Sequence, residues 1–190
     1  MVYLDQDISE VQSDMKTYKQ LKRNNEIVGL GDIIMNEIIY RKTTKVDMEI
    51  LMKLRLEMLS EVNDLPSEYE YDENFISESR RYFESGEQTT VIAFDGETPV
   101  GCASLSYIWI MPTFSHPTGN RAHLMNVYTH ADYRRRGISK KMVEILIDEA
   151  KENGVTEISL DATEMGRPLY QTLGFQVSDS CMVMDLKGNY

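Results

Sequence analysis

The sequence predicts one mixed α/β domain, in which helices pack against a mixed β-sheet. The length of 190 residues is enough for one sizeable core and too short for two ordinary domains. Hydrophobic residues make up 42% and charged residues 27%, which is typical of a globular protein and excludes disordered and fibrous chains. Segments with helical and with strand character follow one another in the order β-α-α-β-β-β-α-β-α-β-β.

The N-terminal extension, residues 1–34, is predicted to be separate from this domain. Its weakly amphipathic stretch ends in a break at residues 29–32, and it contains no chemical motif. We therefore expect it to be dispensable for chemistry, with the domain covering residues 35–190. Met35 is an alternative start of the chain. The extension could still stabilise the fold or an oligomer through its apolar positions Val11, Met15, Tyr18 and Leu21.

The first half of the domain begins with a short strand over 38–40. A capping box formed by Thr44 and Asp47 then predicts the start of a helix with one apolar face, which ends before the break at 64–66. A second amphipathic helix follows and ends near Gly86. The β-branched and aromatic runs at 89–94 and 100–110 predict two strands, joined by a hairpin turn at Asp95 and Gly96.

The second half continues with an irregular loop over 111–120, a strand over 123–129 and a basic turn. A strongly amphipathic helix is predicted from about Gly137 to a C-terminal cap at Asn153 and Gly154. The remaining elements are a strand over 157–160, a short helix over 164–172, and a last pair of strands at 175–177 and 182–186.

Charge is distributed unevenly along the chain. The net charge of −11 argues against a protein whose whole surface binds nucleic acid, because such a surface would repel phosphates. Residues 134–141 nevertheless hold five of the twenty basic residues and no acid, whereas residues 57–87 hold ten acids against Arg80 and Arg81. These two segments predict one anionic and one cationic ligand.

Several classes of protein are excluded by the remaining composition. No apolar run approaches the length of a membrane span and residues 1–20 lack a signal-peptide pattern, so we expect a cytoplasmic protein without membrane contact. Cys102 and Cys181 cannot form a disulfide framework. Without a CxxC motif or closely spaced histidines, no metal site is expected.

The strand over 124–129 runs through Arg134, Arg135, Arg136 and Gly137 directly into an amphipathic helix. The N-terminus of a helix offers unpaired N–H donors, and a glycine lets the backbone curl around an anion. Guanidinium groups add charge-assisted hydrogen bonds. A solvated basic turn and a nucleic-acid patch are alternatives, but the strand-turn-helix arrangement favours a phosphate site.

A second motif consists of Leu169, Tyr170, Gly174 and Phe175. A tyrosine on a short helix before a Leu-Gly-Phe turn can donate a proton in a cleft. A buried tyrosine with a satisfied hydroxyl is the common alternative.

Together the two motifs resemble the GNAT superfamily of acyl-CoA-dependent N-acyltransferases, over residues 37–187. The R/Q-x-x-G-x-G/A loop of that family matches Arg134, Gly137 and Ser139, and its L-Y-x-x-x-G-F segment matches the second motif. Ser139 replaces the usual Gly or Ala, which the loop can tolerate if the side chain points outward.

The resemblance implies an acetyltransferase that uses acetyl-CoA, with direct attack by a primary amine and no nucleophilic residue. It implies that Tyr170 is catalytic, as the proton donor to the departing thiolate. In the family the strand before the loop splays from its neighbour, and its backbone pairs with the pantetheine arm while the loop amides hold the pyrophosphate. The implied acetyl-CoA-binding residues are Val127, Tyr128, Thr129, Arg134, Arg135, Arg136, Gly137, Ile138, Ser139, Lys140 and Thr163, the last standing where many members have an Asn.

Several questions stay open at this stage. The general base could be His123, Asn126 or Glu164, or a water chain. Trp109 and Phe114 could wall the acceptor pocket, with core packing or simple exposure as the alternative. The acid-rich segment favours a cationic small-molecule or peptide amine as acceptor. An acyl-CoA-binding sensor or interaction module without turnover is the alternative function, and a homodimer is left open.

Overall fold

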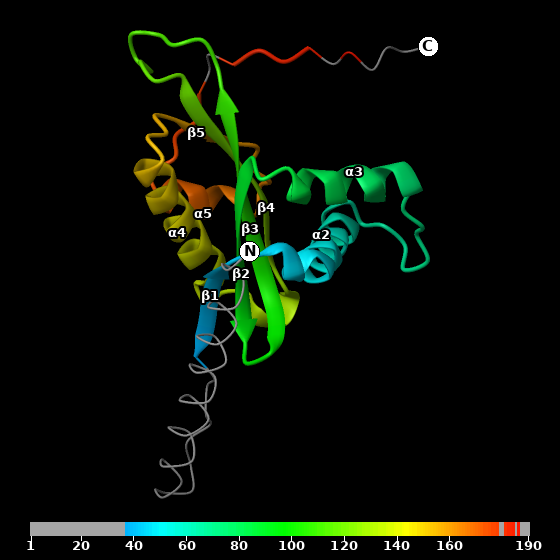
Figure 1. Ribbon diagram of the computed structural model, residues 1–190. Coiled ribbons are helices and arrows are strands. Elements are labelled where there is room, and N and C mark those ends of the chain that lie inside the picture. The colour runs from blue at the N-terminus through cyan, green and yellow to red at the C-terminus, as the bar shows by residue number, and fades with distance from the viewer. Residues whose placement is uncertain (1–36, 179–180, 185, 187–190) are drawn as a thin grey trace, which may run out of the picture. The chain divides into compact units, whose positions relative to one another are not determined.

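The computed structural model describes residues 37–178, 181–184 and 186, and these form a five-stranded sheet with helices on both faces (Figure 1). The strands lie in sequence order: β1 (Ile38–Lys42), β2 (Gln88–Asp95), β3 (Thr98–Trp109), β4 (Asn120–Thr129) and β5 (Ile158–Leu160). Pairing is antiparallel from β1 to β4 and parallel between β4 and β5. The predicted mixed α/β fold is confirmed.

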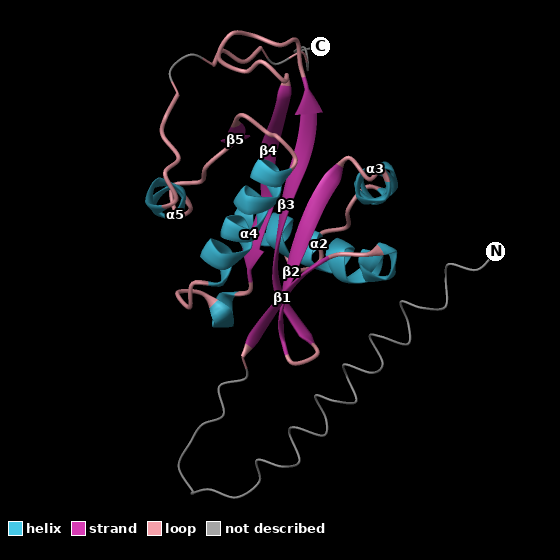
Figure 2. Ribbon diagram, turned by 60° about the vertical axis from the view of Figure 1, so that its left-hand side comes forward, coloured by secondary structure: helices cyan, strands magenta, loops and turns pink. Residues whose placement is uncertain are grey.

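The helices divide between the two faces of the sheet, as Figures 1 and 2 show. Helices α2 (Met48–Val62) and α3 (Glu73–Glu84) lie on one side, and α4 (Ile138–Glu152) and α5 (Arg167–Thr172) on the other. Successive residues of β2 alternate between two cores, with Val91 and Ala93 facing α4 and Ile92 and Phe94 facing α2. Each face of the sheet is therefore buried by its own helix layer.

The capping box predicted at Thr44 is present. The Asp47 carboxylate accepts the Thr44 backbone N–H at 2.7 Å, and a 3₁₀ turn, η1 (Lys45–Asp47), leads into α2. Asp47 is buried and is held from the other side by both terminal nitrogens of Arg41, at 2.6 and 2.8 Å. A strand residue thus fixes the start of the helix, and the paired charge makes burial of the carboxylate tolerable.

The last two predicted strands are not formed among the described residues of 175–186. Residues 175–178 and 181–184 have no regular secondary structure, and the side chains of Val177, Met182 and Met184 are exposed. The prediction of strands from the apolar pattern is wrong for these described residues, because a strand needs a neighbour to pair with. At the edge that they would extend, β5 is three residues long.

The helix expected over 164–172 begins only at Arg167, because a turn at Thr163 and Gly166 precedes it. Residues 1–34, with their predicted apolar positions, lie outside the described residues. In the described part of the chain, no helix combines the length and apolar character that a membrane span requires.

Candidate active site

A β-bulge in the middle of β4 organises the site. Cys102 of β3 pairs with Tyr128, but Ser104 pairs with Met125, so that two residues of β4 stand opposite Ala103 alone. Asn126 occupies the bulge with a φ of 55°, a conformation that asparagine tolerates better than most residues. Bulges of this kind redirect side chains, and here the Asn126 side chain lines a cavity.

The pairing of β4 with β5 ends just before the bulge. The parallel pairing joins only residues 122–124 to 158–160. From Met125 to Thr129, no described strand pairs with β4 on that side. The backbone groups of this edge have no strand partner and can pair with an extended ligand, except that the Asn126 carbonyl accepts from Cys102 and the Thr129 carbonyl accepts from Arg134.

The exposed edge leads into the turn before α4. After the 3₁₀ turn η2 (Ala131–Tyr133), Arg135 has a φ of 65° and Gly137, the N-cap of α4, has a φ of 79°. A Cβ added at Gly137 would meet no atom within 4 Å. The N-cap of α4 therefore has no side chain, and the space that a Cβ would enter there is open, so no side chain at this position blocks an anion from the helix N-terminus.

The three arginines of the turn do not converge as a group. Arg134 donates to the Thr129 carbonyl at 3.1 Å and pairs with Glu61 of α2. Arg136 donates to the Asp132 carbonyl at 2.8 Å and lies over the Tyr133 ring. Of the three guanidinium groups, only that of Arg135 has no partner among the described residues, so the backbone amides make up most of the candidate anion site.

The Ser139 side chain does not point outward. Its hydroxyl lies 2.7 Å from that of Thr129, whose side chain is buried at the end of β4. The outward orientation named as the condition for tolerating this serine is therefore not the one observed. A hydroxyl fits here because a second hydroxyl is within hydrogen-bonding distance.

Tyr170 lies on α5 with its ring packed edge-on against Phe175, at a centroid distance of 5.9 Å. No hydrogen bond joins its hydroxyl to any other residue that the structure describes. Burial raises the pKa of Tyr170, so the phenol is protonated at neutral pH. The described surroundings thus leave the hydroxyl available to a ligand rather than bonded to the core.

Thr163 acts as a turn residue in this structure. Its hydroxyl accepts the Gly166 N–H at 3.1 Å, and its carbonyl accepts the Arg167 N–H at 3.0 Å. These bonds position the start of α5 and hence Tyr170.

A cavity of about 220 Å³, here called the bulge cavity, opens beside β4 on the side of α2 and α3. It is lined by Arg55, Phe75, Glu78, Ser79, Tyr82, Met125 and Asn126. Sequence reasoning missed most of these residues because their helical spacing was attributed to core packing. One signal was available: Arg55 follows Leu51 by one helical turn and so places a cation on an apolar face.

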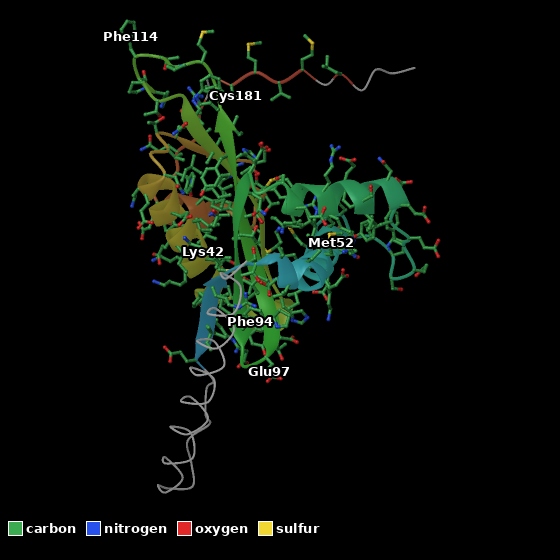
Figure 3. The ribbon with its side chains drawn as sticks, viewed as in Figure 1. Lys42, Met52, Phe94, Glu97, Phe114 and Cys181 are labelled. Carbon is green, nitrogen blue, oxygen red and sulfur yellow. The ribbon has the colours of Figure 1, made fainter. Side chains whose placement is uncertain are left out.

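Neither Trp109 nor Phe114 lines the bulge cavity. Both side chains are exposed, and Figure 3 shows Phe114 in the β3–β4 loop, away from Met52 on α2. Simple exposure, the alternative considered from sequence, describes both residues. The other hypothesis, that they wall the acceptor pocket, does not apply to this cavity.

The residues named from the sequence as candidate general bases do not lie together. The His123 ring bonds to the Ser159 hydroxyl at 2.9 Å, and Glu164 pairs with Arg167 on the surface. Asn126 lines the cavity, but an amide is not a base at neutral pH. Glu78 is the carboxylate that lines the cavity, and it pairs with Arg81 at 2.7 Å.

Cys102 is fully buried beside the bulge. Its Sγ donates to the Asn126 carbonyl at 3.5 Å, and burial raises its pKa to about 12. The thiol therefore stays protonated, which agrees with the prediction that it is packed within its strand and unreactive.

Comparisons with known proteins agree with this geometry. Residues 54–175 match the model of the acetyltransferase (GNAT) family. Glucosamine 6-phosphate N-acetyltransferase of Trypanosoma brucei brucei is 34% identical over 89 residues, which cover 46% of this chain and 57% of the relative. The Arabidopsis thaliana protein of the same name is 25% identical over 135 residues, 70% of this chain and 88% of its own.

A solved structure extends the similarity to the fold. The crystal structure of a predicted acetyltransferase with acetyl-CoA from Clostridium acetobutylicum superposes with a TM-score of 0.71 at 28% identity, covering 79% of this chain and 97% of the other. The family match spans the bulge, the glycine turn and Tyr170. The chain therefore belongs to the GNAT family and is an acetyltransferase.

Proposed function

We propose that this enzyme transfers the acetyl group of acetyl-CoA to a primary amine by direct attack. One observation carries the proposal: the unpaired edge of β4 at 125–129 leads within a few residues to the open N-terminus of α4. The extended arm of acetyl-CoA would lie along the strand edge, and its pyrophosphate would bind at the helix N-terminus. The Clostridium acetobutylicum structure, which contains acetyl-CoA, supports the same ligand.

The residues that would hold acetyl-CoA fall into two groups. The backbone of Val127, Tyr128 and Thr129 provides donors and acceptors along the free edge. The amides from Arg135 to Lys140 provide the anion site, and the space beyond Gly137 accommodates an oxyanion group. Acetyl-CoA supplies the activated acetyl thioester.

The acceptor is expected to enter from the bulge cavity. Met125 and Asn126 line the cavity and directly precede the three residues assigned to the acetyl-CoA arm. Both substrates would therefore meet at one stretch of β4, and fixed backbone N–H donors there stabilise negative charge that develops on the thioester oxygen. The buried, protonated Cys102 is not required, because the amine attacks directly.

Tyr170 is proposed as the proton donor. Its hydroxyl has no partner among the described residues, and its raised pKa keeps it protonated. The proton would pass from the phenol oxygen to the departing CoA sulfur. We further propose a small-molecule acceptor, as in the relatives named glucosamine 6-phosphate N-acetyltransferase, and a cytoplasmic location without nucleic-acid or membrane partners.

The test measures release of free CoA thiol from acetyl-CoA with a panel of primary amines, together with acetyl-CoA binding by calorimetry. We expect saturable binding and amine-dependent thiol release. Binding without release for every amine would favour the sensor function, and absence of binding would overturn the acetyl-CoA assignment.

A further inference from the structure

Arg55 of α2 is a partly buried cation at the bulge cavity. Its Nε donates to the Ser79 hydroxyl at 3.3 Å and one terminal nitrogen donates to the Asn126 side-chain oxygen at 3.4 Å. Its guanidinium lies 5.6 Å from the centre of the Phe75 ring. These partners are neutral, and among the described residues no carboxylate forms an ion pair with Arg55.

Burial without a countercharge is unfavourable for a cation. Burial lowers the pKa of Arg55, yet a guanidinium is still protonated at neutral pH. Two long hydrogen bonds use only part of its five N–H donors. The side chain therefore retains donors and an unbalanced positive charge beside an open cavity.

The nearby acids are already paired. Glu78, which also lines the cavity, bonds to Arg81, and Glu61 bonds to Arg134. Farther along α2, Glu57 lies 3.8 Å from Lys53. Glu78 is the one acid among the residues that line the cavity, and it is paired, so the charged lining group without an ion-pair partner among the described residues is Arg55.

We propose that Arg55 binds an anionic oxygen group, a phosphate or a carboxylate, on the amine that this enzyme acetylates. This proposal rests on the proposed function and specifies its acceptor class. The planar fork of a guanidinium matches two oxygens of either group. An acceptor held at Arg55 by its anionic end lies in the cavity that Met125 and Asn126 share, so its amine is directed toward β4.

The test compares pairs of amines that differ by one anionic group. The phosphate pairs are glucosamine 6-phosphate with glucosamine and phosphoethanolamine with ethanolamine, and the carboxylate pair is β-alanine with its amide. Full-length protein is assayed for CoA-thiol release as wild type, Arg55→Gln and Arg55→Lys. Arg80→Gln is the matched control, because Arg80 on α3 pairs with Glu49 and does not line the cavity.

We expect the wild type and Arg80→Gln to prefer the anionic member of at least one pair. Arg55→Gln should raise KM for that member by about 10- to 100-fold, a much larger change than the same substitution causes for the neutral member. Arg55→Lys should retain part of the preference. The preferred pair decides between phosphate and carboxylate.

A structural role alone predicts a different pattern. If Arg55 only held Asn126 in place, Arg55→Gln would reduce activity on both members of a pair equally, and the proposal would be overturned. Calorimetric binding of the same amines in the presence of CoA gives the same comparison without turnover. Equal affinity of the wild type for both members of every pair would also overturn it, whether or not the protein acetylates any of them.

Discussion

The Ser139 hydroxyl in the first turn of α4 lies 2.7 Å from the Thr129 hydroxyl at the end of β4. The two residues are on either side of the turn that carries the candidate anion site. Their bond therefore fixes the distance between the free strand edge and the helix N-terminus.

Replacing Ser139 by alanine should destabilise this junction. Thr129 is only 7% exposed, and its hydroxyl would lose its side-chain partner. We expect the free energy of unfolding to fall by about 1–3 kcal/mol and acetyl-CoA affinity to weaken. Urea unfolding of Ser139→Ala, Thr129→Val and the double variant measures the coupling. Strictly additive losses would show that the two hydroxyls do not interact.

Gly137→Ala tests the anion site against a matched control at Gly86. Both glycines have a positive φ, 79° and 75°, and at both an added Cβ meets nothing within 4 Å. Each substitution should therefore cost a similar 1–2 kcal/mol, roughly, in backbone strain. Only Gly137→Ala should reduce acetyl-CoA affinity in calorimetry, because its methyl group enters the space assigned to the pyrophosphate. Equal affinities of the two variants would contradict the assignment.

Tyr170→Phe should lower kcat by roughly 10²- to 10⁴-fold with little change in acetyl-CoA affinity or Tm. Because burial raises the pKa of Tyr170 above its ordinary value of 10.0, the donor stays protonated through neutral pH and its contribution is lost only at higher pH. The wild-type rate should fall in that alkaline range, and the variant should lack this step. Tyr107→Phe is the control, since its hydroxyl bonds to Thr89 and Asn153 and its loss should reduce Tm alone.

Asp47→Asn should lower stability near pH 7, because Arg41 and the Thr44 N–H both bind the carboxylate. The hydrogen bond from Arg41, the main cause, lowers the pKa of Asp47 below its ordinary value of 3.8. The stabilisation is therefore complete above that value and is lost as the pH falls toward the lower folded-state pKa. Urea unfolding at pH 7 and pH 3 should show a larger difference between variant and wild type at pH 7 than at pH 3.

The surface pair of Asp148 and Lys151 provides the comparison for Asp47. Both of its side chains are exposed and lie one helical turn apart. Asp148→Asn should change stability by less than about 0.5 kcal/mol at either pH. A loss for Asp47→Asn that is as large at pH 3 as at pH 7 would indicate a packing effect rather than the charged pair.

The sequence predicted those features that depend on local patterns. The capping box at Thr44, the hairpin turn at Gly96 and the glycine before α4 each follow from residues within a few positions. The two last predicted strands do not form among the described residues of 175–186, because strand formation there depends on a neighbouring edge that local alternation does not report.

The site was predicted less completely, for a related reason. Arg134 was expected at the phosphate, but Glu61 lies 73 positions away in the chain and binds its guanidinium. Arg55 was not singled out from the sequence, and it becomes a site residue because Asn126, 71 positions later, lies next to it. Contacts between residues so distant in sequence produce no periodic pattern in a single sequence, so they could not be predicted from it.

The extra residue at Asn126 also reverses the phase of β4. Before it, Leu124 faces the core under α4, and an uninterrupted strand would turn Tyr128, four residues on, to the same face. Tyr128 instead packs in the core under α2. The side chains of β4 before and after Asn126 therefore alternate between the two faces of the sheet in opposite phase. One extra residue causes this change. Deletion of Asn126 would turn each β4 side chain from Val127 to Thr129 toward the opposite helix layer. The orientation of the strand edge that is assigned to the ligand therefore depends on this one residue.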